Sequence, residues 1–354
     1  MEKRLVGTFK PKQTMQTLTG ILKRVAIGVL AGLMPASCSI MDYEGDCSVN
    51  YRARFRYDMH LHYSDAFAHE VESVTLYAFD ESGKFVQQFT DSGEALQQEG
   101  YALPFELPAG TYQFVAWCGV ENELQSHNVP TLTPGVSTVE ELTCTINREY
   151  DENRQATVEE IAPVFHAFVP HCTLPDEPGT HDIDIPLTKD TKTVRIVLQH
   201  LSGEPVDVNQ FSFQITDENG LMAHDNSLLD DELLHYQPYY TASGTADMNS
   251  DGSRATTAIS TALAELTVGR LVKDKDTRTI LTVHNDKGET VLSIPLIDYA
   301  LLIKGYYNQD LSDQEYLDRQ DEYNLTFFLD ENNHWISSSI LINSWRVVLS
   351  ETEL

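Results

Sequence analysis

Short runs of alternating apolar and polar residues, separated by turn residues, recur along this chain of 354 residues. The clearest run is Tyr51–Tyr57, in which tyrosine, alanine and phenylalanine alternate with three arginines. A period of two residues is typical of a strand with one buried face. We interpret the arginines as the solvated face of this strand, and an anion site is the alternative. Such runs at regular intervals predict an all-β fold and favour β-sandwiches over barrels.

Glycine-containing turns predict three hairpins. Their turns are Asp80–Gly83, Pro108–Gly110 and Asp286–Gly288, and the second would pair residues 101–107 with residues 112–119. Proline presets φ and glycine permits positive φ, so both residue types suit turns. Thr216–Gly220 repeats the first turn after another β-rich run. This repeat suggests two related β modules.

Other segments are less regular. Val74–Phe79 is apolar on both faces and predicts a central strand. Residues 256–269, rich in alanine and threonine, are ambiguous, and residues 299–307 fit a short helix. The end of the chain, residues 336–349, is apolar and β-branched. A terminal strand of this kind must be paired, because an unpaired one would promote aggregation.

Residues 21–48 predict that the chain is exported. Lys23 and Arg24 precede the apolar segment Val25–Met34, and small residues then lead to Cys38. A basic patch before ten apolar or small residues is typical of a secretory signal, and such a segment is too short to span a bilayer. We therefore predict that residues 1–37 are a signal peptide.

The small residues before Cys38 resemble the lipobox of bacterial lipoproteins, although Pro35 stands where that box prefers leucine. The resemblance implies that Cys38 becomes the first mature residue and carries N-palmitoyl and S-diacylglycerol groups, with no other cofactor. Cleavage near Ser37 without lipidation is the alternative. Acidic residues soon after the cysteine resemble signals that place lipoproteins on the cell exterior, so we expect a lipid-anchored protein of the outer membrane.

The net charge of the chain limits the classes of partner that it can bind. Removing residues 1–37 takes away six basic residues and one acidic residue, which changes the net charge from −30 to −35. Nucleic acids and anionic headgroups are bound through clusters of lysine and arginine, so we expect neither to bind the protein surface. About 317 residues remain, more than one compact core usually needs. We predict a lipidated linker of residues 38–48 and two domains, 49–187 and 188–354.

Four further cysteines could form disulfides if the chain is exported. In an exported chain an even set favours disulfides, and buried free thiols are the alternative. The sequence alone does not resolve the pairing. These residues are Cys47, Cys118, Cys144 and Cys172.

Taken together, five stretches resemble the FimB/Mfa family of fimbrium anchoring lipoproteins, the base subunits of type V fimbriae. The resemblance implies two tandem transthyretin-like Greek-key β-sandwich domains and a non-catalytic role that holds a fimbrial shaft on the outer membrane. The stretches lie in family order and span nearly the whole mature chain. They are Phe55–Asp58 with Asp65–Phe67, Val74–Asp80, Leu107–Gly119, Leu187–Leu198 and Ile340–Val348.

The resemblance also implies a mode of assembly. In that family, shaft subunits polymerise when a strand from one subunit fills a groove in its neighbour, which is a form of β-augmentation. We hypothesise that the apolar end of the chain pairs across the subunit junction, while the protein's own groove stays filled and stops growth. The alternative is a core strand of the second domain. The predicted partner-binding residues are Ile340, Ile342, Trp345, Val347 and Leu349.

Metal sites are not expected. Asp247–Gly252 copies the opening of a calcium loop, but Ala258 stands where that loop needs a bidentate glutamate. His60 and His62 would lie on one face of a strand, and His166, His171 and Cys172 are close in sequence. A zinc site needs further ligands at suitable spacing, so we interpret these as ordinary histidines.

No enzyme is predicted, because the chain has no nucleophile elbow, no phosphate-binding glycine loop and no His-Glu-x-x-His pattern. A glycan-binding or adhesin lipoprotein is the alternative function, since it would share the sandwiches and the lipid. In that case Tyr236, Tyr239 and Tyr240 would stack on sugars, although such tyrosines are more often packing residues.

Overall fold

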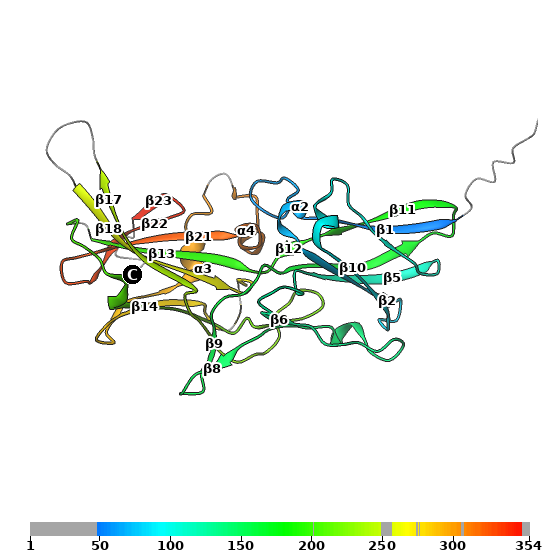
Figure 1. The fold of residues 1–354 in the computed structure, drawn as a ribbon, viewed down its shortest axis with the longest axis horizontal. Coiled ribbons are helices and arrows are strands. Elements are labelled where there is room, and N and C mark those ends of the chain that lie inside the picture. The colour runs from blue at the N-terminus through cyan, green and yellow to red at the C-terminus, as the bar shows by residue number, and fades with distance from the viewer. Residues whose placement is uncertain are drawn as a thin grey trace, which may run out of the picture. The chain divides into compact units, whose positions relative to one another are not determined.

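The computed structural model describes residues 48–200, 202–248, 257–273, 275, 277–305 and 308–348. The described residues from Val49 onward belong to one compact unit. They form β-strands with a few short helices (Figure 1), so the predicted all-β class is confirmed. The strands are arranged in sheets that pack as β-sandwich-like layers.

The first sandwich packs a three-stranded sheet against a five-stranded sheet. The smaller sheet has the order β11-β1-β4 and the larger one the order β12-β10-β5-β2-β3. Phe105 of the smaller sheet meets Phe114 of the larger one, with ring centroids 5.7 Å apart, inside the core between them. The strands are β1 (Val49–Arg56), β2 (Ser73–Asp80), β3 (Phe85–Ser92), β4 (Leu103–Phe105), β5 (Gly110–Cys118), β10 (Phe165–Leu174), β11 (Gly179–Pro186) and β12 (Thr188–Lys189).

The larger sheet of this sandwich is apolar on both faces. Tyr77 and Phe79 of β2 and Trp117 of β5 form a second core on its outer face. This core is covered by the segment that follows β5, including a small sheet of the order β15-β7-β6. The prediction of a central strand at Val74–Phe79 is confirmed, because β2 lies between β5 and β3. The covering elements are β6 (His127–Asn128), η2 (Val139–Glu141), β7 (Cys144–Ile146) and β15 (Leu221–Met222).

The second sandwich contains two six-stranded sheets. Their orders are β17-β18-β13-β21-β22-β23 and β20-β19-β14-β16-β9-β8. A single apolar core lies between them, and Phe327, Leu325 and Tyr323 of β21 are fully buried in it. The first sheet comprises β13 (Lys192–His200), β17 (Tyr240–Met248), β18 (Thr257–Val268), β21 (Glu322–Leu329), β22 (Trp335–Ile342) and β23 (Trp345–Val348). The second comprises β8 (Glu149–Tyr150), β9 (Ala156–Val158), β14 (Phe211–Asp217), β16 (Leu234–Tyr236), β19 (Ile280–Asn285) and β20 (Thr290–Pro295).

Strand pairing crosses the predicted domain boundary between residues 187 and 188. β9 precedes it and pairs in parallel with β16, while β15 follows it and pairs with β7. These exchanges connect the first half of the sequence to the sheets of the second half. The division into domains 49–187 and 188–354 stays a prediction.

The second predicted hairpin is wrong. β4 pairs with β1, whereas β5 pairs with β10 and β2, so the turn Pro108–Gly110 carries the chain from one sheet to the other. The repeat at Thr216–Gly220 is likewise no hairpin, because β15 pairs with β7 and not with β14. Turn residues predict a reversal of direction, but they do not specify which sheet receives the next strand. The hairpins β2–β3 and β19–β20 are confirmed.

Helices are short and lie between strands. The ambiguous alanine- and threonine-rich segment is the strand β18, and the short helix expected at residues 299–307 lies earlier, as α3. No helix within the described residues is long and apolar enough to cross a membrane. The helical elements are α2 (Phe67–Glu70), η1 (Gly93–Gln97), η3 (Val208–Gln210), α3 (Leu296–Leu301) and α4 (Asp313–Arg319).

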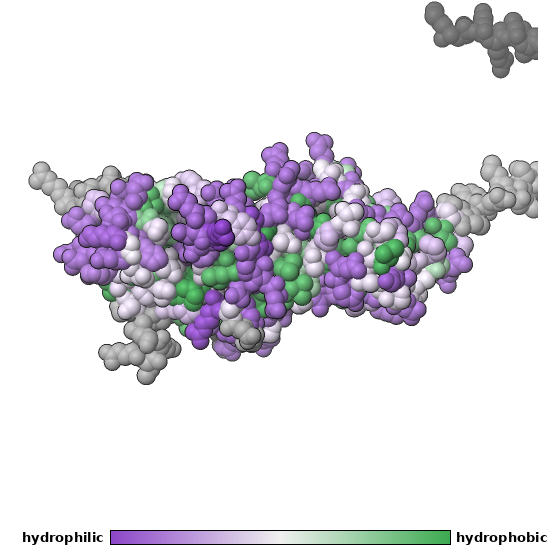
Figure 2. All heavy atoms as spheres, turned by 90° about the horizontal axis from the view of Figure 1, so that it is seen from below, coloured by the Kyte–Doolittle hydropathy of each residue, from purple (hydrophilic) through white to green (hydrophobic). Residues whose placement is uncertain are grey.

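Hydrophilic residues cover most of the face drawn in Figure 2, and its hydrophobic residues form small separate groups. The arginine row of β1 is part of a solvated face, as predicted. Arg52 and Arg54 both pair with Asp182 of the neighbouring β11, at 2.8 and 2.6 Å. These three side chains are partly exposed, so we expect the pairs to contribute little stability.

Candidate functional site

The last two described strands form a hairpin. β22 and β23 are joined by Asn343 and Ser344, whose φ angles are 46° and 70°. Two consecutive residues with positive φ form a two-residue turn whose twist matches that of the strands on either side. β23 is therefore an edge strand, paired only with β22 within the sheet that the structure describes.

The predicted partner-binding residues are divided between core and surface. Ile340 and Ile342 are fully buried in the core of the second sandwich, as in the alternative of a core strand. Trp345 pairs with Ile342 at the sheet edge and is 63% exposed. Val347 pairs with Ile340 through the backbone, and Leu349 lies outside the described residues. Of the described residues predicted to bind a partner, those of β22 are thus buried in the core, whereas Trp345 lies exposed on the edge strand β23.

The first strand, β1, lies between two others. It pairs in parallel with β11 over all eight of its residues and antiparallel with β4 over Tyr51–Ala53. Its inward side chains Tyr51, Ala53 and Phe55 are at most 5% exposed. The period-two pattern predicted the buried face, but it carried no sign of the parallel partner 130 residues away. Cys38, the predicted lipidation site, lies before β1 and outside the described residues.

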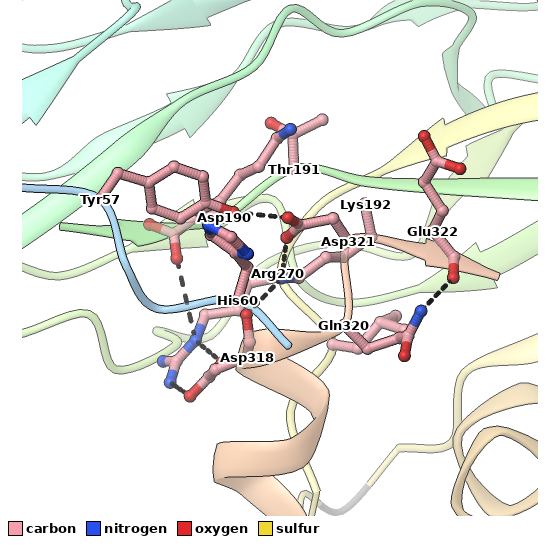
Figure 3. Close-up of polar contacts among 12 residues, drawn as sticks. Tyr57, His60, Asp190, Thr191, Lys192, Arg270, Asp318, Gln320, Asp321 and Glu322 are labelled. Atoms are coloured by element: carbon pink, nitrogen blue, oxygen red, sulfur yellow. Dashed lines mark hydrogen bonds and ion pairs between the residues drawn. The ribbon is translucent and has the colours of Figure 1, made fainter. Parts of the chain in front are cut away.

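A cluster of charged residues lies next to Tyr57, which directly follows β1 (Figure 3). The Tyr57 hydroxyl donates to Asp321 at 2.5 Å, and Lys192 Nζ donates to the Asp318 carbonyl at 2.7 Å. Lys192 Nζ also lies 3.3 Å from Asp321. Lys192 is completely buried, and this burial lowers its pKa, against the opposing effect of the nearby aspartates. Burial and the Asp321 charge raise the pKa of Tyr57 well above its usual value.

A second part of this cluster surrounds Asp190. Asp190 accepts a hydrogen bond from Asn226 at 2.9 Å and lies 3.8 Å from Arg270, which makes a two-bond pair with Asp318. The other Asp190 oxygen is buried and has no partner among the described residues. Burial raises the pKa of Asp190 to about 7, although Arg270 and the Asn226 bond act in the opposite direction.

Arg319 of α4 holds the loop that follows β1. Its carbonyl accepts from Leu61 N at 3.2 Å, its guanidinium donates to the Asp58 carbonyl at 3.2 Å, and it lies 4.7 Å from the centre of the Tyr63 ring. These contacts join the first sandwich to α4 and β21 of the second. We name the residues Tyr57, Lys192, Arg319 and Asp321 the junction cluster. No local pattern indicated it, because Tyr57, Lys192 and the segment with Arg319 and Asp321 are each more than a hundred residues apart in the chain.

The other predicted sites are placed as follows. His60 and His62 lie in a turn after β1 and not on a strand, so that expectation is wrong; His60 Nε2 contacts the Ser64 carbonyl at 2.7 Å. His166 contacts the His224 carbonyl, and burial lowers its pKa to about 4. Within the described residues, no group of three or more potential ligands is placed to hold a metal ion. Most of the segment Asp247–Gly252, which was not expected to bind calcium, lies outside these residues.

The cysteines and the tyrosine row have structural explanations. Cys118, Cys144 and Cys172 are free thiols, and the first two are buried, while Cys47 lies outside the described residues. The three tyrosines do not form one exposed platform. Tyr236 is completely buried and donates to Asn219, and Tyr239 donates to Glu265.

Comparison with known proteins assigns the family. A family model described as fimbrillin-A associated anchor proteins Mfa1 and Mfa2 matches residues 43–351. A candidate polysaccharide-binding protein from Bacteroides thetaiotaomicron is 31% identical, with a TM-score of 0.73 over 87% of this chain and 100% of that one. A candidate adhesin from the same organism is also 31% identical, with a TM-score of 0.76 over 85% and 97% of the two chains.

The fimbrial anchor protein Mfa2 from Porphyromonas gingivalis is 16% identical, with a TM-score of 0.61 over 86% of this chain and 100% of that one. At this identity the likeness concerns the fold alone. No curated protein matches the chain. Because the family model covers most of the sequence, the chain belongs to the family of fimbrillin-A associated anchor proteins.

Proposed function

We propose that this protein is a non-catalytic base subunit that holds a fimbrial shaft on the outer membrane and ends its growth by β-strand complementation. Membership of the family gives a fimbria-associated role. The observation that carries the finer proposal is that β1 is paired on both sides within its own chain.

The pairing of β1 within its own chain explains why growth of the shaft would stop at this subunit. Without β1, the edges of β11 and β4 would be unpaired and the core beneath Tyr51, Ala53 and Phe55 would be open. A groove of this form is what a strand from another subunit would fill, with backbone bonds for affinity and side-chain pockets for register. Because β1 already fills it, the groove accepts no further subunit.

The same strand would carry the load from the membrane. The eleven residues Cys38–Ser48 lead directly into Val49, the first residue of β1. Fully extended, they reach at most about 40 Å. Tension on a lipid at Cys38 would act along β1. All the backbone pairs between β1 and β11 would then resist this tension together. The junction cluster then connects the far end of β1 to the second sandwich.

The shaft would be bound at β23. An edge strand presents unpaired backbone groups to which another strand can be added. Trp345 is exposed there, whereas Ile340 and Ile342 hold β22 in the core. We therefore propose that the shaft adds a strand at β23 and does not displace β22.

Replacing Cys38 tests the membrane attachment. Cys38→Ala should abolish palmitate labelling and release fimbriae into the medium, whereas Cys172→Ala, which removes another free thiol, should do neither. Label retained in Cys38→Ala would show that another residue is lipidated. An unchanged amount of cell-bound fimbriae would contradict a role at the base.

Deleting residues 345–354 tests the shaft contact. The proposal predicts a folded protein that no longer co-purifies with shafts, since β22 remains paired with β21. An unfolded second sandwich would instead show that β23 is needed for the core. A folded protein that still binds shafts would contradict binding at β23.

A further inference from the structure

The outer face of the first sandwich carries a cavity that neither the membrane attachment nor the strand pairing uses. Its volume is about 970 Å³, and it lies between β2 and β3 on one side and residues 120–131 on the other. Thr75 and Tyr77 of β2 and Gln88 of β3 line it. Tyr77 pairs with Gln88 across the two strands, which places both side chains on this face.

Three side chains that line the cavity are deeply buried yet keep unused hydrogen-bonding groups. Thr75, Tyr77 and His127 are 8%, 7% and 6% exposed. Neither of the two hydroxyls has a hydrogen-bond partner among the described residues. Both hydroxyls are accessible from the cavity, since neither is among the fully enclosed side-chain atoms that lack a partner. The cavity therefore has a polar lining that is free to bind.

His127 adds a neutral group. The Ser126 hydroxyl accepts from Ala162 N at 2.9 Å and lies 3.0 Å from His127 Nδ1, which leaves Nε2 as the remaining polar atom of the ring. Burial lowers the pKa of His127 to about 4. The imidazole thus stays uncharged near neutral pH.

The rim of the cavity determines the charge of a ligand. Among the residues that the structure describes, no lysine or arginine lines it and its charged residues are all glutamates, so an anion would be repelled. The most numerous lining side chains are amides, which both donate and accept hydrogen bonds. These amides are Gln88, Gln97, Asn122, Gln125, Asn128 and Asn147.

We propose that this cavity binds a neutral oligosaccharide. A sugar presents many hydroxyls that donate and accept at once, which matches amides, hydroxyls and a neutral imidazole. A cavity of about 970 Å³ lies at the upper end of the range for small-ligand sites, which suits a ligand of several sugar units. The inference does not depend on the proposed role at the fimbrial base, since no residue of the cavity belongs to β1, β23 or the junction cluster.

The test is calorimetric titration of the whole mature protein with a panel of neutral hexasaccharides: gluco-, manno-, xylo- and galacto-oligosaccharides. At least one should bind with a dissociation constant below about 5 mM. The double variant Thr75→Val with Tyr77→Phe keeps the shape of both side chains but removes two hydroxyls. Each hydrogen bond lost should weaken binding about fivefold, so the double variant should lose at least tenfold.

Gln88 and Gln87 form a matched pair for this experiment. Gln88→Ala should weaken binding severalfold, while Gln87→Ala should not, because neighbouring residues of a strand point to opposite faces and only Gln88 lines the cavity. Three outcomes would overturn the proposal: no binding by any member of the panel, binding unchanged in the double variant, or binding of pentalysine without any sugar. Palmitate labelling and shaft binding should be normal in all these variants, which separates this proposal from the function at the base.

Discussion

The Tyr57 hydroxyl donates a 2.5 Å hydrogen bond to Asp321, a residue 264 positions later in the chain. Tyr57 directly follows β1, and Asp321 directly precedes β21. The bond therefore connects the first strand of one sandwich to a central strand of the other.

Tyr57→Phe should destabilise the protein by about 1–3 kcal/mol, because the completely buried Tyr57 loses a partly buried hydrogen bond to a carboxylate while its ring stays in place. Urea unfolding of the mature protein measures this change. Tyr63→Phe is the control, since Tyr63 is 57% exposed and contacts Arg319 through its ring. Equal stability of the two variants would show that the Tyr57–Asp321 bond contributes nothing.

Lys192→Met should cost about 3–5 kcal/mol, because it removes a completely buried cation and leaves the largely buried Asp321 carboxylate without it. The control is Lys273→Met. Lys273 pairs with Asp298 at 3.2 Å, but both side chains are partly exposed, so its loss should cost at most about 1 kcal/mol. A small loss of stability in Lys192→Met would mean that water or a shift of α4 compensates the carboxylate charge left without Lys192.

Asp190 should make stability depend on pH. Its pKa in the folded protein is raised to about 7, above its usual 3.8, so the folded state holds the proton more tightly than the unfolded state. The contribution of Asp190 is therefore fully present below about pH 4 and is lost as the pH rises through about 7. Relative to Asp190→Asn, the wild type should lose a few kcal/mol of unfolding free energy between pH 4.5 and 7.5.

This comparison is made by urea unfolding at several pH values. The buried His127 and His166 act in the opposite direction, because their pKa values are lowered to about 4 in the folded protein. Their contribution to the stability of the protein is lost as the pH falls below about 6.5. Both are present in the wild type and in Asp190→Asn, so their effect cancels in the difference. Parallel curves for the two proteins would show that Asp190 does not hold its proton in the folded state.

Trp345→Ala and Ile342→Ala should separate binding from folding. Trp345 is 63% exposed, so its truncation should change stability by less than about 0.5 kcal/mol but weaken co-purification with shafts. Ile342 is fully buried, so its truncation should cost about 2–5 kcal/mol. Thermal unfolding and a pull-down of shafts give the two readouts. Normal shaft binding by Trp345→Ala would argue against an interface at β23.

Local sequence patterns were enough to predict individual strands and turns. Alternation in Tyr51–Tyr57 predicted β1, and the turns Asp80–Gly83 and Asp286–Gly288 predicted two hairpins that the structure contains. These patterns are reliable because strand periodicity and turn conformation depend on neighbouring residues alone. The all-β class followed from many such patterns together.

Which strands pair with one another depends on contacts between distant parts of the chain. The turn Pro108–Gly110 predicted a reversal, but it carried no information on whether the next strand stays in the sheet or crosses the core. Lys192 stood in an alternating strand pattern like any polar residue, and its burial depends on partners 126 and 129 residues away. Pairing between distant strands and the burial of a charge both depend on contacts across the whole fold, and a local pattern does not encode them.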